Sequence, residues 1–420
     1  MAVRILRKPF LCAAVICALI FYSGFLSFSQ KNPLFFLFAR EDIRAVSGTI
    51  LSSPVKTRSG RFYSCDFRLN SVRSADGSAC GASGEILLYI PSEIVEALYP
   101  GGLHSGGRGE GRESALFETG LHAVFSGRFS DSSFFASDCA ASWWDGSFAG
   151  RIRRFRALCR LAFKRMMFAW GNAGGLILAL LCGARDFTEP STSDAFRTAG
   201  LSHILALSGM HLSLFSSLAV FAGKKAGSIH LSYILRIVIV SVFVWFAGFS
   251  PSLLRAFICV LISIFASIAG IPDLPMFDVL CAAFLVQCAV CPSHIHNAGF
   301  MLSYGALAGI SLFAPLVNGF LSRLFPRSAS SSLSSSVSAQ ALTAPITLRV
   351  FGTFSPVGII AAVFVSPLVT FFVYSALALI IISLIFPIFQ VPSGIFMNFL
   401  YTVIKTMVLW FSRASVIGAR

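Results

Sequence analysis

The sequence carries little charge, and its second part has almost no acidic residues. Only 12% of its 420 residues are charged and 56% are apolar, whereas about 25% of an average soluble protein is charged. Residues 1–150 hold 14 basic and 13 acidic residues, but residues 151–420 hold 19 basic and five acidic ones. This shortage of charge excludes an ordinary soluble enzyme. The mean hydropathy of +0.79 indicates a polytopic membrane protein with a cationic membrane part.

The net charge of +14 on residues 151–420 has two explanations. Cytoplasmic loops of membrane proteins are rich in Lys and Arg, which accounts for a basic balance without any ligand. A path for a polyanion, or a site for anionic lipid, would require the same excess. Charge alone does not separate these explanations.

Several catalytic motifs are missing from the sequence. It contains no Walker A motif and no G-x-S-x-G nucleophile elbow. His294 and His296 form H-x-H, but Ala298 stands where a metallo-β-lactamase-type motif needs its Asp. Cys288 and Cys291 form C-x-x-C inside an apolar run, without further ligands at zinc-like spacing. The sequence therefore predicts no metal, no cofactor and no nucleotide hydrolysis.

Eight of the 11 cysteines lie in apolar stretches, where cysteine packs as a small hydrophobe. The other three, Cys65, Cys80 and Cys139, lie in the one segment that reads as soluble. They allow one disulfide, with Cys65 and Cys80 as candidates, and one remaining thiol, if that segment faces an oxidising compartment.

The first 170 residues divide into three parts. Residues 1–40 form an uncleaved transmembrane anchor, because basic residues precede the apolar run Phe10–Phe28. Residues 41–148 contain four or five short alternating runs, which predict a small β-barrel or sandwich outside the cytoplasm. Residues 149–170 predict a basic amphipathic helix on the membrane surface, with one apolar face formed by Ile152, Phe155, Leu158, Ala162 and Phe163.

Residues 171–420 predict a mainly α, polytopic membrane domain with seven to nine spans. Two apolar segments, Gly174–Cys182 and Ala339–Val350, are too short to span and indicate re-entrant or interfacial helices. Val357–Phe386 is long enough for a bent span or a pair, with a break at Pro367. The serine-rich stretch Ser328–Ser338 has the composition of a low-complexity connector.

The segment Ala195–Phe215 concentrates polar residues in an apolar setting. It holds His203, Ser208 and His211, with Arg197 just before them. On an unbroken helix the two histidines lie about 80° apart, close enough to line one wall. Such residues at membrane depth normally face a cavity or the bundle interior. The alternatives are hydrogen-bonding contacts between packed helices, or an intramembrane hydrolase using Ser208 with His203 or His211.

Two further segments carry candidate binding residues. Pro251 starts a helix and places Arg255 one turn inside it, where phosphate would be a suitable partner. Alternatively, Arg255 reaches the membrane surface or pairs with Asp186, Glu189 or Asp194. In Ser338–Pro356, Gln340 and Arg349 lie on a short helix that ends at Gly352.

These segments resemble the ComEC family of competence proteins. Ala195–His211 matches the family motif A-F-x-x-x-G-x-x-H-x-L-A-x-S-G-x-H almost throughout. Three more elements follow in the family's order: P-S-x-x-R-A at Pro251–Ala256, G-F-x-L-S-[FY] at Gly299–Tyr304, and A-Q-x-x-T-x-P with F-x-x-F-S-P-x-G at Ala339–Gly358. The segment 41–148 is similar in position and strand pattern to the family's extracytoplasmic OB-like domain.

The resemblance implies a multi-pass channel in the inner membrane that passes single-stranded DNA into the cytoplasm during natural transformation, and not an enzyme. It implies a helix-hairpin-helix DNA receptor and a cytoplasmic helicase-like motor as partners. We also expect contact with membrane lipid and with a second copy of the chain. Many members continue into a metallo-β-lactamase-like domain, but this sequence ends at Arg420, so we expect no nuclease activity. We predict that the DNA path is lined by Arg197, His203, Ser208, His211, Arg255, Gln340 and Arg349. The alternatives are the hydrolase and a transporter of another anionic polymer.

Overall fold

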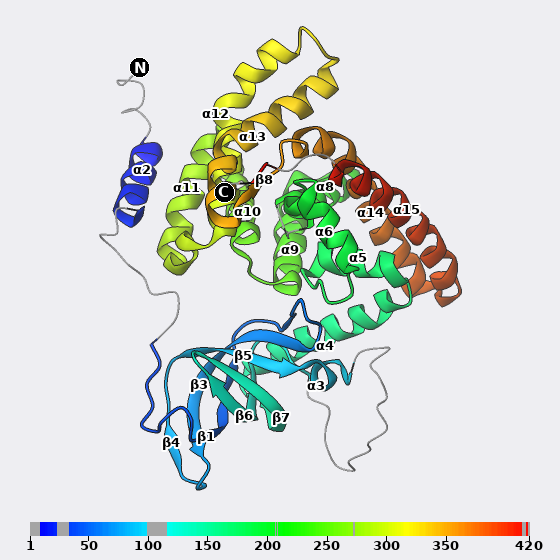
Figure 1. Ribbon diagram of the computed structural model, residues 1–420. Helices are drawn as coiled ribbons and strands as arrows, with labels where there is room; N and C mark the ends of the chain where they lie inside the picture. Colours follow the sequence, from blue (N-terminus) through cyan, green and yellow to red (C-terminus); the bar gives the residue numbers. More distant parts are fainter. Residues whose placement is uncertain are drawn as a thin grey trace. The chain divides into compact units, whose positions relative to one another are not determined.

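The chain folds into two compact units. The computed structural model describes residues 9–22, 33–98, 116–205, 207, 209–271, 274–413 and 417–418. The barrel unit comprises residues 29–175 and 184–187, and the membrane unit comprises the rest (Figure 1). The short segment 184–187 thus groups with the barrel unit although the chain on both sides of it belongs to the membrane unit.

The barrel unit is built from short strands at the positions where the sequence alternates. Its elements are β1 (Ile43–Ile50), β2 (Val55–Lys56), β3 (Phe62–Ser74), β4 (Ala79–Gly81), β5 (Glu85–Pro91), α3 (Ser92–Glu96), β6 (Leu121–Ser130), β7 (Ser133–Trp144) and α4 (Phe148–Phe168) (Figure 1). The runs predicted near residues 44, 62, 84 and 120 are therefore strands.

Five strands close on themselves in the order β1-β3-β5-β7-β6-β1, because β1 pairs with both β3 and β6. The β5–β7 pair is parallel and the other pairs in the ring are antiparallel. Along β3, Tyr63, Cys65, Phe67 and Leu69 are buried while the residues between them are not. This alternation fills the inside of the barrel with apolar side chains and leaves the other face of each strand for contacts outside the core.

The candidate disulfide between Cys65 and Cys80 is not formed, and both thiols are free. Cys65 lies opposite Leu88, whereas Cys80 lies opposite Val72, further along the same strand β3. The seven residues from 65 to 72 span roughly 23 Å of strand, while a disulfide needs Cα atoms about 4.4–6.8 Å apart. Cys65 is a core residue, and burial raises the pKa of its thiol.

Helix α4 lies where the sequence predicts a helix, and most of its predicted apolar face is turned away from the barrel. The apolar side chains Phe148, Ile152 and Phe155 are exposed, whereas Arg160 and Lys164 are buried. Arg160 pairs with Glu118 at 2.9 Å, and Lys164 pairs with Asp186 at 3.6 Å. Periodicity along the helix could not indicate these two ion pairs, because their carboxylates lie far away in the sequence.

The membrane unit is entirely helical except for the short pair β8 (Thr353–Phe354) and β9 (Ile417–Gly418), as far as the described residues go. Its helices are α2 (Pro9–Tyr22), α5 (Gly171–Cys182), α6 (Pro190–Thr198), α7 (Ser202–Leu205), α8 (Gly209–Lys225), α9 (Ile229–Ala247), α10 (Pro251–Ile268), α11 (Met276–Val290), η1 (Pro292–His296), α12 (Ala298–Leu321), α13 (Arg327–Phe351), α14 (Gly358–Ile385), η2 (Pro387–Phe389) and α15 (Gln390–Ser412) (Figure 1). Helix α5 begins in the barrel unit and ends in the membrane unit.

Within the described part of the chain, five helical segments are long and apolar enough to cross a membrane: α9, α10, α12, α14, and η2 together with α15. The chain is thus a mainly α, multi-pass membrane protein with a small β domain. Seven to nine spans were predicted. The number of full-length helices is lower because two predicted segments form the shorter helices α8, of 17 residues, and α11, of 15 residues.

The serine-rich stretch is not a connector but the first half of the 25-residue helix α13. Ser330, Ser334 and Ser338 recur every fourth residue and are buried, and α13 packs along α12 (Figure 1). A side chain on Gly309 of α12 would collide with the backbone oxygen of Ser338, so the two backbones touch there. Small residues allow helices in a membrane to approach this closely.

Helix α14 is continuous over 28 residues, and Pro367 lies inside it. Of the two predicted alternatives, the structure shows a single span, and no break occurs at Pro367. A proline removes one backbone hydrogen bond, but a helix in a bilayer tolerates it because unfolding any part of the backbone in hydrocarbon exposes more unpaired groups.

Candidate functional site

The predicted polar helix is broken, and the break is the centre of the first candidate site. Helix α7 ends at Leu205 and α8 begins at Gly209, with a backbone carbonyl of Leu207 between them that accepts a hydrogen bond from Ser252 at 2.7 Å. Ser252 lies in the first turn of α10, which Ser250 caps. The amino ends of α8 and α10 therefore lie close together, and both carry partial positive charge.

Arg255 fills the space beside this break. Its side chain is 6% exposed, and its Nη2 lies so close to Gly209 that an added Cβ would be 2.9 Å away. The guanidinium donates to the backbone oxygen of Ser303 and lies 6.0 Å from the ring centre of Tyr304. Its Nε has no hydrogen-bond acceptor among the described residues.

None of the three carboxylates considered as partners of Arg255 is paired with it. Asp186 pairs with Lys164, Glu189 with Lys405 at 2.6 Å, and Asp194 with Arg197 at 3.2 Å. Among the described residues, Arg255 makes no ion pair. It is a buried cation held by a carbonyl and an aromatic ring, and no carboxylate among the described residues neutralises it.

A buried amide connects Arg255's neighbours to each other. Gln287 of α11 is fully buried, donates from Nε2 to the backbone oxygen of Pro251 at 3.0 Å, and accepts from the Tyr304 hydroxyl at 2.9 Å. Gln287 thus fixes the start of α10 and the ring beside Arg255. The sequence analysis missed this residue, although a lone amide in an apolar run was a usable signal.

The two histidines do not share a wall of one helix, because the break separates them. His203 lies on α7 and is exposed, whereas His211 lies in the first turn of α8 and is fully buried. Of the predicted path residues, His211 is therefore on the helix whose start contacts Arg255. Ser208 lies outside the described residues, so the hydrolase alternative gains no support.

The remaining predicted path residues lie elsewhere in the membrane unit. Arg197 is exposed on α6 and paired with Asp194. Arg349 is exposed in the last turn of α13. Gln340 also lies on α13, and its Oε1 is buried without a hydrogen-bond partner among the described residues. The structure therefore brings Arg255 and the helix of His211 together and places the other three on different elements.

The barrel unit carries a second candidate site, a groove of about 890 Å³ on the outer face of the strands. Arg44 and Arg128 lie on it, and both are exposed. Phe62 and Phe135 line it with their rings perpendicular and 5.8 Å apart. Phe135 in turn stacks on Tyr89, with ring centres 4.6 Å apart and planes at 11°. Arginines beside flat, half-buried rings form the combination that single-stranded nucleic acids bind.

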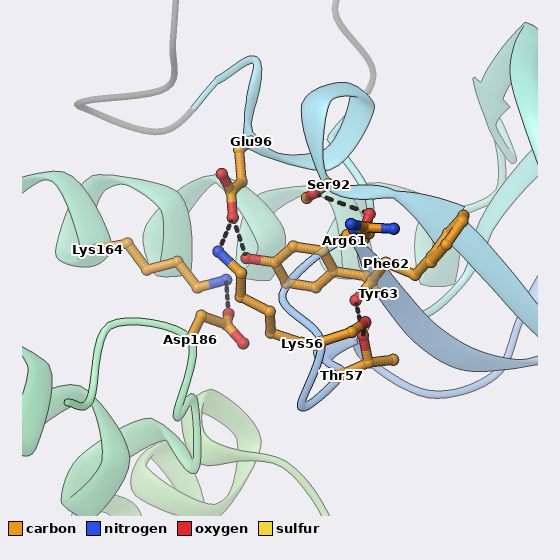
Figure 2. Close-up of polar contacts among 10 residues, drawn as sticks. Lys56, Thr57, Arg61, Phe62, Tyr63, Ser92, Glu96, Lys164 and Asp186 are labelled. Atoms are coloured by element: carbon orange, nitrogen blue, oxygen red, sulfur yellow. Dashed lines mark hydrogen bonds and ion pairs between the residues drawn. The ribbon is translucent and has the colours of Figure 1, made fainter. Parts of the chain in front are cut away.

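Polar contacts join β2, β3 and α3 (Figure 2). Lys56 pairs with Glu96 at 2.6 Å, and the Tyr63 hydroxyl donates to the same carboxylate at 2.9 Å. Close by, Lys164 of α4 faces Asp186 of the segment 184–187 (Figure 2). The strand that carries Phe62 is therefore anchored at its beginning by charged contacts.

The pKa values of the two buried carboxylates of the barrel unit are shifted in opposite directions. Burial opposes ionisation of Glu118, but the charges of Arg160 and Lys164 and a hydrogen bond from Ser53 lower its pKa below the ordinary value. Burial raises the pKa of Asp186, and Lys164 offsets this only in part. In the described part of the chain, no cluster of His, Cys, Asp or Glu has the geometry of a metal site.

Comparison with known proteins gives two matches. The family model described as Competence protein matches residues 180–418. ComE operon protein 3 of Bacillus subtilis (strain 168) is 25% identical over 134 residues, which cover 32% of this chain and 17% of that protein. The matched region thus spans about a sixth of the length of this relative. No solved structure matches the chain.

Proposed function

Because the chain belongs to the competence protein family, we propose that it acts in DNA uptake as a channel through which a single DNA strand crosses the cytoplasmic membrane. The matched region contains both Arg255 and the break between α7 and α8. The substrate we propose is therefore a polyanion that passes a buried cation within the helical bundle.

The observation that carries this proposal is Arg255. Burying a guanidinium in a membrane protein without a carboxylate costs several kcal/mol. The bundle nevertheless holds it beside the amino ends of α8 and α10, which attract the same sign of charge. An arrangement that concentrates positive charge at a helix break favours a phosphate group as the ligand. His211, one turn inside α8, and Gln340, with its free carbonyl oxygen, are further candidates for the same path.

The barrel supports the proposal as a guide for the incoming strand. We propose that the barrel is of the OB type. A parallel pair closes its ring of otherwise antiparallel strands and a helix precedes the fourth strand of the ring, which supports this proposal. In such barrels the second and third strands and the loops beside them bind oligonucleotides. Here these two strands are β3 and β5, which carry Phe62 and Tyr89. We assign the barrel to the outer side of the membrane.

The proposed setting includes partners that feed and pull the strand. A helix-hairpin-helix receptor would deliver DNA from outside, and a helicase-like motor in the cytoplasm would supply the energy, because the chain has no Walker A motif of its own. A second copy of the chain could complete the passage.

The test is DNA internalisation in a deletion strain that expresses single variants. Arg255→Ala is expected to abolish uptake of labelled DNA, while Arg255→Lys, which keeps a charge without the planar fork, retains part of it. The matched control is Arg236→Ala. Arg236 is a half-buried arginine on α9 that donates to Ser216, away from the break.

The amount of each variant in the membrane is measured alongside uptake, so that loss of the protein is not mistaken for loss of transport. Normal uptake by an Arg255→Ala variant present at the wild-type level would refute the proposal. An equal loss of DNA uptake in Arg236→Ala would show that the effect is not specific to Arg255, and this would also refute the proposal.

A further inference from the structure

Helix α4 presents an apolar stripe to its surroundings. Phe148, Ile152 and Phe155 are 74%, 39% and 60% exposed, and they follow one another at the three- and four-residue spacing that puts side chains on one helical face. The same helix buries Arg160 and Lys164 on the side that faces the barrel. Ala157, Leu161 and Met167 are buried on α4 as well, so the helix has an apolar inward face and, in addition, an apolar outward stripe.

The outward stripe indicates an apolar environment outside α4. Burying two cations requires two buried carboxylates as partners, which Glu118 and Asp186 supply. Exposing large apolar side chains to water costs roughly 1.5–3 kcal/mol for each one that could have been buried. A soluble partner face would explain the apolar stripe but not the exposed arginines on its border, Arg151 and Arg154.

We propose that α4 lies in the surface of an anionic lipid bilayer, with Phe148, Ile152 and Phe155 in the acyl boundary and Arg151 and Arg154 at the headgroup phosphates. Two observations favour lipid over a protein partner. The guanidinium groups border the apolar stripe, as in interfacial helices that bind anionic membranes. The chain also continues from α4, which ends at Phe168, into the apolar helix α5 only three residues later.

The proposal is independent of the DNA path. It requires only that the barrel unit attaches to the membrane through α4, so that Arg255 variants would leave the attachment intact. Conversely, variants of α4 would change lipid contact without removing any residue of the groove.

Site-specific photo-crosslinking in the full chain tests the contact. A benzophenone amino acid replaces Phe148 or Phe155, the protein is reconstituted in vesicles of phosphatidylethanolamine and phosphatidylglycerol, and adducts are identified by mass spectrometry after irradiation. The matched control is the same replacement at Phe135, a half-buried ring on the barrel. The positive control is Phe371 on α14, which is 54% exposed on a membrane-spanning helix.

Lipid adducts at both α4 positions, comparable to those at Phe371 and absent at Phe135, are the expected result. Replacing Arg151 and Arg154 together by Gln is expected to reduce adducts at Phe148 severalfold in vesicles with phosphatidylglycerol, and to leave them unchanged in phosphatidylcholine vesicles. Adducts to protein instead of lipid would overturn the proposal, as would lipid adducts of equal yield at Phe135. Using two positions guards against one replacement that prevents folding.

Discussion

The groove on the barrel allows base stacking and phosphate contact to be separated by experiment. The Phe135 ring is stacked on the Tyr89 ring, and Arg128 lies on the same groove as an exposed cation. If a single DNA strand binds there, Phe135→Ala removes a stacking platform and Arg128→Ala removes a charge. The two changes should alter different properties of the same binding curve.

The magnitudes follow from the chemistry of each contact. A stacking aromatic is worth about 1–3 kcal/mol per base, so Phe135→Ala should weaken binding roughly 5- to 150-fold at every salt concentration. One phosphate contact contributes about 0.7 to the slope of log K against log salt for single strands. Arg128→Ala should therefore lower the slope by about 0.7, which changes the affinity ratio between about 50 and 200 mM salt by about 2.5-fold.

The assay is fluorescence anisotropy of a labelled oligonucleotide with the full chain in detergent, at several salt concentrations. Phe135→Leu keeps most of the packing volume without a π face and should lose affinity like Phe135→Ala. Trp143→Ala is the control, because Trp143 is an exposed ring stacked on His122 and does not line the groove. Two results would refute the groove as the binding site. One is a slope of log K against log salt that changes in Phe135→Ala and not in Arg128→Ala, and the other is wild-type affinity in both variants.

Three further predictions test the packing and the charges. Gly309→Ala should push α12 and α13 apart at Ser338 and cost about 1–3 kcal/mol of stability in a thermal unfolding assay, whereas Gly305→Ala, whose added Cβ would meet its nearest neighbour at 3.4 Å, should be tolerated. Arg160→Met should cost about 3–5 kcal/mol in the unfolding of the barrel unit because it leaves Glu118 buried without its partner, and adding Glu118→Leu should restore most of that loss; a double variant as unstable as the single one would contradict this. Hydrogen bonds from Lys405, Ser191 and Tyr401 lower the pKa of Glu189 to about 2 from an ordinary value of 4.5, so its contribution to stability is complete above pH 4.5 and is lost as the pH falls towards 2. The melting temperatures of wild type and Glu189→Gln should accordingly differ at pH 6 and converge in acid, and a constant difference would disprove the assignment.

The sequence predicted those features that depend on neighbours along the chain. Alternating residues located β1, β3, β5 and β6, and Pro251 located the start of α10. Apolar length predicted the spans α9, α10 and α14, although it could not show that α14 continues through Pro367, because that depends on the cost of opening a helix in lipid.

Features that depend on contacts between distant residues were not predicted. Arg160 and Glu118 are 42 positions apart, so no periodicity could indicate that α4 would bury Arg160. Gln287 and Tyr304 acquire their roles only because α11 and α12 pack beside α10. The serine-rich stretch failed as a connector for the same reason, since its helix depends on α12 for packing.

The serine repeat on α13 also bears on how the two helices are aligned lengthwise. Ser330, Ser334 and Ser338 present the same small volume once per turn, so a slide of α13 by four residues, about 6 Å, would exchange one serine for the next with little change in packing. Two contacts oppose such a slide. The Ser330 hydroxyl donates a hydrogen bond of 2.7 Å to the Asn318 side chain, and the backbone of Ser338 packs directly against Gly309. The serine repeat alone therefore does not fix the register of α13 against α12, and these two contacts do.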